Sequence, residues 1–183
     1  MYRATDTKLK REVISPCVDA DDVRIWEIVN SAASAYRGVI PADCWREPYM
    51  SLDELHSEIN SGVLFVGYRE QAGLVGVMGS QDVEDVTLIR HAYVLPDTQG
   101  RGVGHALLAH LLSVASRPVL VGTWTGAAWA IRFYERHGFR LTAPEEARRL
   151  LERYWSVGAR QMEASSVLLG PGTHRARAGA VEL

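Results

Sequence analysis

Cysteine is scarce in this chain, and its thiols stand apart. Cys17 and Cys44 are the only two cysteines among 183 residues, and they form no Cys-x-x-Cys pair. Isolated thiols indicate neither a disulfide framework nor a zinc site. The six histidines are scattered, and no two lie four residues apart as in a helical metal motif. The sequence therefore predicts no metal centre.

Excess charge of one sign and long apolar runs are also lacking. The 20 Lys and Arg residues are balanced by 22 Asp and Glu residues, which gives a formal net charge of −2. Nucleic-acid binding draws on clustered excess cations, so this balance disfavours nucleic acid as a partner. Residues 1–10 are polar, unlike a signal peptide, and no run is long enough to cross a bilayer. We expect a cytoplasmic protein without a membrane partner.

The length and composition fit one domain with a substantial core. The chain has a mass of 20.3 kDa and 47% hydrophobic residues. We expect a single domain over residues 1–169. The remaining residues, 170–183, contain Gly, Pro, His and Arg and are expected to be a disordered tail.

Apolar periodicity predicts helices that alternate with strands. A first helix is expected after Asp19 or Asp21, because residues 25–32 carry an apolar stripe, and a second begins at Ser51, where Glu54 completes a capping-box pattern. Further helices are expected over 102–116, 127–137 and 144–154, and strands over 13–14, 63–68, 74–79, 87–94, 119–124 and 162–169. The result is a mixed sheet with helices on both faces, an α/β or α+β sandwich.

The most informative segment is residues 94–104, Val-Leu-Pro-Asp-Thr-Gln-Gly-Arg-Gly-Val-Gly. A strand pattern ends at Pro96, and a helical pattern begins among the glycines. Gly100, Gly102 and Gly104 permit positive φ and remove the Cβ atoms that would hold a ligand away from the backbone. Such a turn aims several backbone N–H groups and a helix N-terminus at one point, which suits an anion such as a diphosphate.

Two familiar phosphate loops do not fit this segment. A P-loop needs Lys-Ser or Lys-Thr after its last glycine, and neither follows Gly104. A dinucleotide fingerprint needs Gly-x-Gly-x-x-Gly and an acidic residue on the next strand, and residues 119–124 contain no acid. For the glycines alone, a tight strand-to-helix turn without a ligand stays open.

The order Val-x-Pro at residues 94–96 and Gln-x-x-Gly-x-Gly at residues 99–104 resembles the acyl-CoA loop of the GNAT family of N-acetyltransferases. Residues 130–139, Ala-Ile-Arg-Phe-Tyr-Glu-Arg-His-Gly-Phe, are similar to a later helix of that family. The resemblance is strongest over residues 87–139. It implies the acyl-CoA N-acyltransferase fold, in which a mixed, mostly antiparallel central sheet contains a splayed parallel pair of strands.

The resemblance also implies acetyl-CoA as the acyl-donor substrate. The pantetheine arm would lie between strands 87–94 and 119–124, and backbone N–H groups of the glycine turn would hold the diphosphate. Arg101 would add a charge-assisted contact, unless it is a solvated surface charge. The implied cofactor-binding residues are Tyr93, Val94, Gln99, Gly100, Arg101, Gly102, Val103 and Gly104.

Tyr134 matches the tyrosine that acts in this family as the general acid. A phenol with a pKa of about 10 can exchange a proton with the leaving thiolate. The alternative is that Tyr134 is only a packed aromatic beside Phe133. Because no Cys or Ser stands in an activated constellation, we expect direct attack by the amine without a covalent enzyme intermediate.

The general base does not follow from the pattern. The positions where the family often carries Glu or His fall at Leu88 and Arg90, and neither side chain can act as a base. His91 is adjacent, but strand alternation places it on the opposite face unless a bulge re-aims it. Glu84 and Asp85 are candidate bases that would act through a water molecule. The alternative is that they are only solvated charges in a turn.

Three residues are candidates for binding the acceptor amine. Arg90 would pair with a carboxylate or phosphate of the acceptor, unless it is paired within the fold or solvated. Trp45 and Tyr49 belong to the aromatic-rich segment 36–50, where the family builds its acceptor site. They would either line the acceptor pocket or pack on the core.

These observations predict an acetyl-CoA-dependent N-acetyltransferase that acts on a primary amine. Small-molecule and protein amines stay open as acceptors, as does the oligomeric state, a homodimer included. One alternative is a non-catalytic acyl-CoA-binding or sensor module, because the usual base is missing. Another is an interaction domain that has lost the cofactor.

Overall fold

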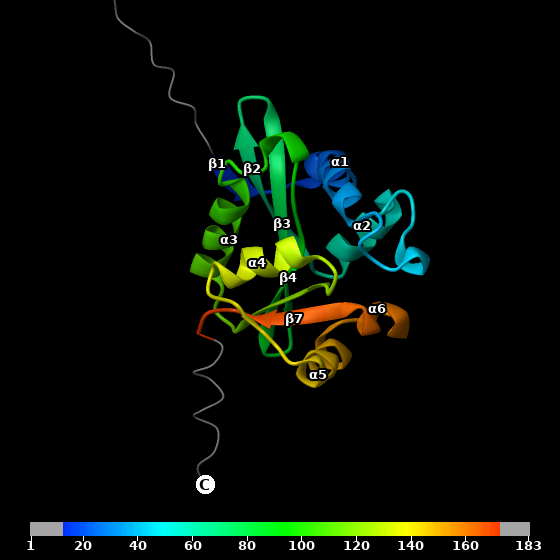
Figure 1. The fold of residues 1–183 in the computed structure, drawn as a ribbon. Coiled ribbons are helices and arrows are strands. Elements are labelled where there is room, and N and C mark those ends of the chain that lie inside the picture. Colours follow the sequence, from blue (N-terminus) through cyan, green and yellow to red (C-terminus); the bar gives the residue numbers. More distant parts are fainter. Residues whose placement is uncertain (1–12, 173–183) are drawn as a thin grey trace, which may run out of the picture.

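A mixed seven-stranded sheet runs through the protein in the order β1-β2-β3-β4-β5-β7-β6 (Figure 1). The computed structural model describes residues 13–172. Neighbouring strands are antiparallel except β4 and β5, which are parallel, so the expected mostly antiparallel sheet with one parallel pair is confirmed. The strands are β1 (Val13–Pro16), β2 (Leu64–Glu70), β3 (Gly73–Val83), β4 (Val86–Val94), β5 (Val119–Trp124), β6 (Arg140–Leu141) and β7 (Ser165–Leu169).

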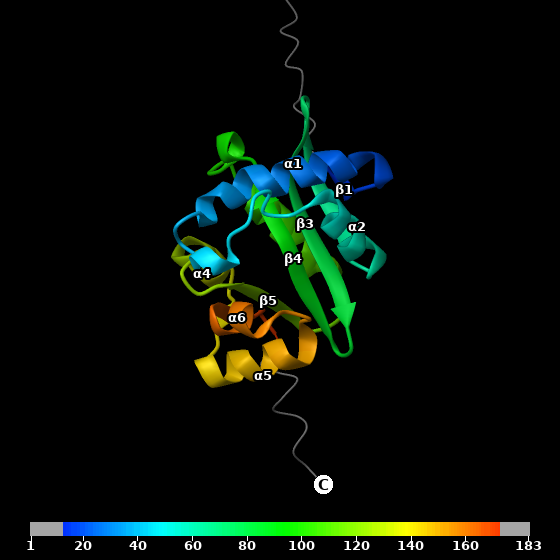
Figure 2. The same ribbon diagram turned by 90° about the vertical axis from the view of Figure 1, so that its right-hand side faces the viewer.

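Helices cover both faces of the sheet, as expected. One face carries α3 and α4, while α1, α2, α5 and α6 lie on the other (Figure 2). The helices are α1 (Asp22–Ala33), α2 (Leu52–Asn60), α3 (Val103–Val114), α4 (Ala128–Glu135), α5 (Pro144–Tyr154) and α6 (Ala159–Glu163).

Local sequence explains the first two helices. The apolar stripe of α1 is buried through Ile25, Ile28 and Val29, which pack on β2 and β3 in one cluster. At the start of α2, the backbone N–H of Glu54 donates to Ser51 Oγ, and the backbone N–H of Ser51 donates to Glu54 Oε2. Both orphan donors are thereby satisfied, and the predicted capping box is confirmed.

The alternation of β4 divides the core into two layers. Leu88 packs among α5 residues, whereas Ile89 packs among α3 residues on the opposite face. Each side chain is almost fully buried. The sheet between them therefore separates two apolar layers. A molecule could pass from one layer to the other only where neighbouring strands part.

The structure differs from the expected elements near the C-terminus. The expected strand over 162–169 begins only at Ser165, because residues 159–163 form α6, in which the N–H of Met162 donates to the carbonyl of Gly158. Strand β6 was not expected, since two residues carry no periodicity. Of the tail expected to be disordered, residues 173–183 lie outside the described residues.

The described residues hold neither a helix suited to cross a membrane nor a cluster suited to bind a metal ion. None of the helices within residues 13–172 combines the length and the apolar character that a membrane crossing requires. The same range holds no group of three or more His, Cys, Asp or Glu side chains placed to bind a metal ion.

Candidate active site

The parallel strands β4 and β5 part at their carboxyl ends. Residues 87–89 pair with residues 119–121, and no pair follows, although both strands continue. Beyond Ile89, β4 remains paired with β3 on one edge only. Its other edge carries backbone groups that need partners. The gap between the strands therefore suits an extended ligand that supplies hydrogen-bonding groups of its own.

The chain turns from β4 into α3 through two left-handed glycines. A 3₁₀ turn, η4 (Pro96–Thr98), follows the strand, and then Gly100 and Gly102 have φ angles of 76° and 86°. Residues with a Cβ rarely adopt this conformation. Gly102 is the N-cap of α3, so the first N–H groups of the helix and the positive end of its dipole face the turn.

Side-chain contacts fix this glycine turn to the strands beside it. The amide Nε2 of Gln99 donates to the carbonyl of Val94 at 3.1 Å. The guanidinium of Arg101 lies 2.8 Å from the carboxylate of Glu70 on β2, and both side chains are partly exposed. An ion pair of this kind is weak in water, so Arg101 can exchange its partner for a phosphate at little cost.

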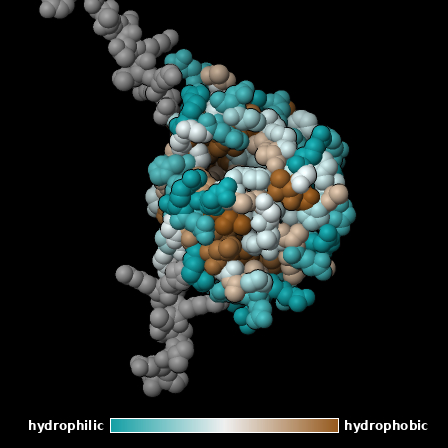
Figure 3. Space-filling model, in the orientation of Figure 1, coloured by the Kyte–Doolittle hydropathy of each residue, from teal (hydrophilic) through white to brown (hydrophobic). Residues whose placement is uncertain are grey.

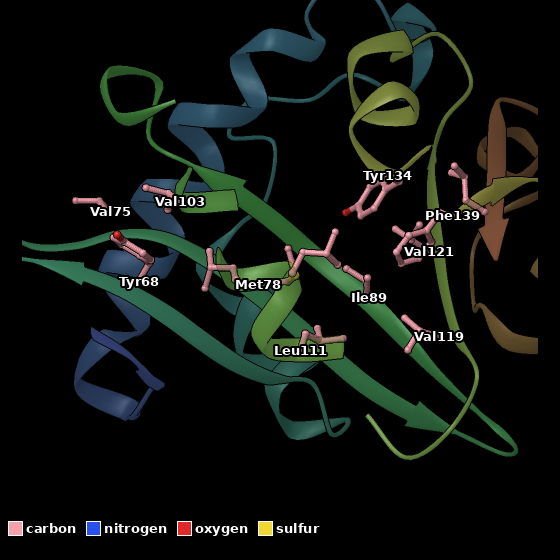
Figure 4. Close-up of a cluster of buried hydrophobic side chains, with 13 residues drawn as sticks. Tyr68, Val75, Met78, Ile89, Val103, Leu111, Val119, Val121, Tyr134 and Phe139 are labelled. Carbon is pink, nitrogen blue, oxygen red and sulfur yellow. The ribbon is translucent and has the colours of Figure 1, made fainter. Parts of the chain in front are cut away.

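Tyr134 reaches the gap from the face that carries α3 and α4. Its ring projects from α4 toward the space between β4 and β5, near Val121 and Phe139 (Figure 4). Only 5% of the residue is exposed, and its ring centroid lies 5.3 Å from that of Phe139. Burial, followed by the nearby phenol of Tyr36, raises the pKa of Tyr134 well above its ordinary value. The phenol is therefore neutral and holds a proton. Figure 3, in the orientation of Figure 1, shows apolar side chains exposed among polar ones in the middle of the side of the molecule that faces the viewer.

A β-bulge interrupts β4 at the start of the gap. Val77 pairs with Tyr93 and Gly79 pairs with Arg90, so two residues of β4 stand opposite the single residue Met78. Within the bulge, His91 has a φ of 50°, which is unusual for a residue other than glycine. Backbone strain of this kind persists where the surrounding structure imposes it, and it is concentrated at functional sites.

The bulge turns His91 to the same face as Arg90. Its ring stacks on Phe65, and its Nε2 lies 3.3 Å from Glu58 Oε2 on α2, close but without the alignment of a hydrogen bond. Regular strand alternation therefore does not hold at His91, and the alternative of a bulge that re-aims it is the one observed, because the extra residue shifts the phase of the pleat.

Arg90 is paired within the fold. Its Nη2 donates to both carboxylate oxygens of Glu58, at 2.8 and 2.6 Å, and its Nη1 donates to Gln81 Oε1 at 2.9 Å. Burial alone would raise the pKa of Glu58, but the adjacent His91 ring and the charge of Arg90 hold it below its ordinary value. The geometry thus favours the structural alternative for Arg90.

An aromatic cavity of about 150 Å³ opens on the face opposite Tyr134. Tyr36 stacks on Tyr49 with ring centroids 5.9 Å apart, and the indole N–H of Trp124 donates to the hydroxyl of Tyr49 at 3.0 Å. Burial and the neighbouring phenols, Tyr49 first, raise the pKa of Tyr93 well above its ordinary value. The aromatic walls of the cavity are Tyr36, Tyr49, Tyr93, Trp124 and Trp155, and His91 also lines it.

Of the two aromatic acceptor candidates, the structure brings only Tyr49 to the cavity wall. Trp45 packs behind Tyr49 with ring centroids 5.7 Å apart, and the guanidinium of Arg37 lies over its outer face. The sequence pattern does not single out Trp155 or Tyr36 as lining residues. Trp155 lies in the link between α5 and α6, so no local pattern connects it to β4.

The carboxylates Glu84 and Asp85 lie at the wrong end of β4. They form the hairpin before the strand, where Arg153 on α5 donates to both and the hydroxyl of Tyr154 donates to Asp85 at 2.7 Å. The gap lies at the other end of this nine-residue strand, at a rise of about 3.3 Å per residue. The hypothesis that either acts as a base through water is therefore wrong.

Comparison with known proteins identifies the family. A family model described as an acetyltransferase (GNAT) domain matches residues 28–152. The chain therefore belongs to the GNAT acetyltransferases, whose acyl donor is acetyl-CoA, and the resemblance seen in the sequence is confirmed. A search of curated proteins found no match to this sequence.

Solved structures share the fold at low sequence identity. The PaiA N-acetyltransferase of Thermoplasma acidophilum, in complex with coenzyme A, superposes with a TM-score of 0.65 at 16% identity, over 87% of this chain and 98% of that one. The ribosomal-protein-S18-alanine N-acetyltransferase of Escherichia coli gives 0.61 at 20%, over 87% and 93%. The putative acetyltransferase YncA of Salmonella typhimurium, with acetyl-CoA, gives 0.57 at 22%, over 73% and 82%.

Proposed function

We propose that this acetyltransferase moves the acetyl group of acetyl-CoA to a primary amine by direct attack. One observation carries the proposal: the gap between β4 and β5 joins a glycine turn and a buried phenol on one face to an aromatic cavity on the other. A donor entering from the first face and an acceptor entering from the second would meet between the strands.

The donor would be held mainly by backbone groups. The N–H groups of residues 100–104 would bind the diphosphate, helped by the α3 dipole. The backbone groups of Tyr93 and Val94 that face the gap would pair with the pantetheine amides, the carbonyl of Val94 accepting from the ligand as well as from Gln99, with the thioester near the bulge. Gln99 would keep the turn on the end of β4, and Arg101 would leave Glu70 for a phosphate.

The acceptor nitrogen would attack the thioester carbonyl carbon, forming a C–N bond as the C–S bond breaks. Tyr134, neutral because it is buried, would give its proton to the departing sulfur. The amine proton would pass to His91, which lines the cavity. Glu58, a positioning residue, lies against Nε2 of that ring and leaves Nδ1 to take the proton.

A non-catalytic acyl-CoA-binding module is the competing function, because Leu88 and Arg90 occupy the usual base positions. His91 in the bulge favours catalysis over this alternative. The test is thiol release from acetyl-CoA over a library of amines, together with a calorimetric titration of CoA. Amine-dependent thiol release supports the enzyme. Saturable CoA binding with no release for any amine supports the binding module, and no CoA binding at millimolar CoA contradicts both.

A further inference from the structure

We propose that the acceptor is a small primary amine that carries one aromatic ring and no carboxylate. The inference rests on the proposed function and concerns the aromatic cavity lined by Tyr36, Tyr49, Tyr93, Trp124 and Trp155. Its size, its walls and its charge each narrow the class of molecule that fits.

The size of the cavity matches one ring. The space is about 150 Å³. A closed apolar cavity of about this volume takes up benzene. The present cavity is partly open and also has polar lining residues, which include Thr123, Gln161 and Ser165. A ring with a short aminoalkyl chain would therefore fill the cavity and leave the nitrogen directed to the gap, whereas an oligosaccharide or a folded polyamine is too large.

The walls of the cavity are flat, aromatic and held in place. The indole of Trp155 lies on the backbone of β5, so close that a Cβ at Gly122 would stand 3.4 Å from three of its atoms. On the other side, Tyr36 is fixed by stacking on Tyr49 and by an edge contact with Tyr93. Rigid aromatic faces favour a planar apolar group, with edge-to-face or offset contacts.

The charges of the cavity disfavour an acceptor with a second ionised group. No Asp or Glu lies among the described residues that line it, so the two ammonium groups of a diamine would compete for the same aromatic faces. Of the lining residues, Arg90 carries a fixed positive charge, but Glu58 already holds it through two hydrogen bonds. A carboxylate on the acceptor would have to separate this pair or remain buried without a cation.

The aromatic walls also suit the amine before it loses its proton. The phenol of Tyr36 remains neutral, since burial, and then Tyr49, raises its pKa to about 12. An ammonium group is attracted to the faces of neutral aromatic rings without a carboxylate counter-ion. The cavity can therefore bind an amine as its cation. His91 would take the first proton to give the neutral amine that attacks, and the second amine proton would replace the one that Tyr134 gives to the sulfur, so that one proton is released overall.

A matched acceptor panel tests the inference with wild-type protein and acetyl-CoA. The probes are 2-phenylethylamine, phenylalanine (the same ring and amine with a carboxylate), 1,4-diaminobutane, and a short peptide with a free N-terminal alanine. We expect kcat/KM for 2-phenylethylamine to exceed that for each other probe by roughly 100-fold or more. Turnover that favours phenylalanine, the diamine or the peptide overturns the inference, and so does acetyl-CoA binding without turnover of 2-phenylethylamine. An absence of acetyl-CoA binding overturns the proposed function itself.

A pair of variants tests the role of charge separately. Glu58→Gln removes the carboxylate from Arg90, so the freed guanidinium can bind a carboxylate. Gln81→Ala removes only a neutral partner of the same guanidinium. We expect the ratio of kcat/KM for phenylalanine over 2-phenylethylamine to rise about tenfold in Glu58→Gln. It should stay within twofold of wild type in Gln81→Ala. An unchanged ratio in a folded Glu58→Gln protein overturns the charge argument, and if that variant does not fold, the wild-type panel decides.

Discussion

His91 Nε2 lies 3.3 Å from Glu58 Oε2, a contact that joins the bulge of β4 to α2. The bulge creates this contact, because regular alternation would direct the His91 ring to the opposite face. One extra residue thus brings an ionisable group to the aromatic cavity at the point where β4 and β5 part.

Replacing His91 should remove the proposed base without unfolding the strand. Asn tolerates positive φ better than most residues, so His91→Asn suits a backbone with φ of 50°. We expect kcat to fall by about 100-fold or more, with the CoA dissociation constant unchanged. His110→Asn on α3, away from the cavity, is the control. Full activity of His91→Asn across the pH range would remove His91 from the mechanism.

Tyr134→Phe tests the general acid. The substitution keeps the ring that packs on Phe133 and Phe139 and deletes only the hydroxyl. We expect kcat to fall by about 100-fold, while CoA affinity and melting temperature stay close to wild type. A fall in stability with kcat unchanged would mean that Tyr134 is only a packed aromatic.

Gly102, the N-cap of α3, has a left-handed backbone conformation, so adding a single methyl group there should weaken CoA binding. Gly102→Ala places a Cβ on a residue with φ of 86°, at a cost of about 1 kcal/mol or more. We expect weaker CoA binding by about tenfold in calorimetry. The matched control is Gly158→Ala, because Gly158 has φ of −66° and open space around it. Equal CoA affinity in both variants would show that the turn does not hold the diphosphate.

Acid should weaken the link between β2 and the start of α1. A hydrogen bond from Arg69 to Asp21, at 2.6 Å, lowers the pKa of Asp21 below its ordinary value. Because the folded pKa lies below the unfolded one, the stabilisation is present above about pH 4 and is lost as the pH falls through the folded pKa. In urea unfolding between pH 6 and pH 3, Asp21→Asn should lose less stability than wild type. An equal loss of unfolding free energy between pH 6 and pH 3 in Asp21→Asn and in wild type would mean that the Asp21–Arg69 pair does not contribute to stability.

The hairpin carboxylates should not matter for turnover. Glu84→Gln leaves Asp85 bonded to Tyr154 and touches nothing near the gap. We expect kcat within about twofold of wild type, and at most a small loss of stability, since exposed ion pairs contribute little. A large fall in kcat would restore Glu84 as a candidate base.

The sequence predicted the donor side of the fold well, because its signals are local. Glycines at alternate positions after a strand pattern indicated the turn, and Gly100 and Gly102 do adopt positive φ. The capping box at Ser51 and the apolar stripe of α1 are equally short-range. Such features follow from neighbours along the chain, and they need no tertiary information.

The acceptor side could not be predicted in the same way. The cavity brings together Tyr36, Tyr93 and Trp155, which stand far apart in the chain, and no spacing connects them. The re-aimed His91 depends on one unpaired residue in the register between β3 and β4. For Arg90, the sequence left open whether the side chain binds the acceptor or is paired within the fold. Only the approach of Glu58 from α2 favours pairing within the fold.

The most direct test is an initial-rate study of thiol release, with acetyl-CoA varied at several fixed concentrations of 2-phenylethylamine. Direct attack across the gap requires both substrates to be bound at once. It predicts intersecting double-reciprocal lines, and no release in the absence of amine. Parallel lines, with an acetylated protein detected by mass spectrometry before amine is added, would contradict the account.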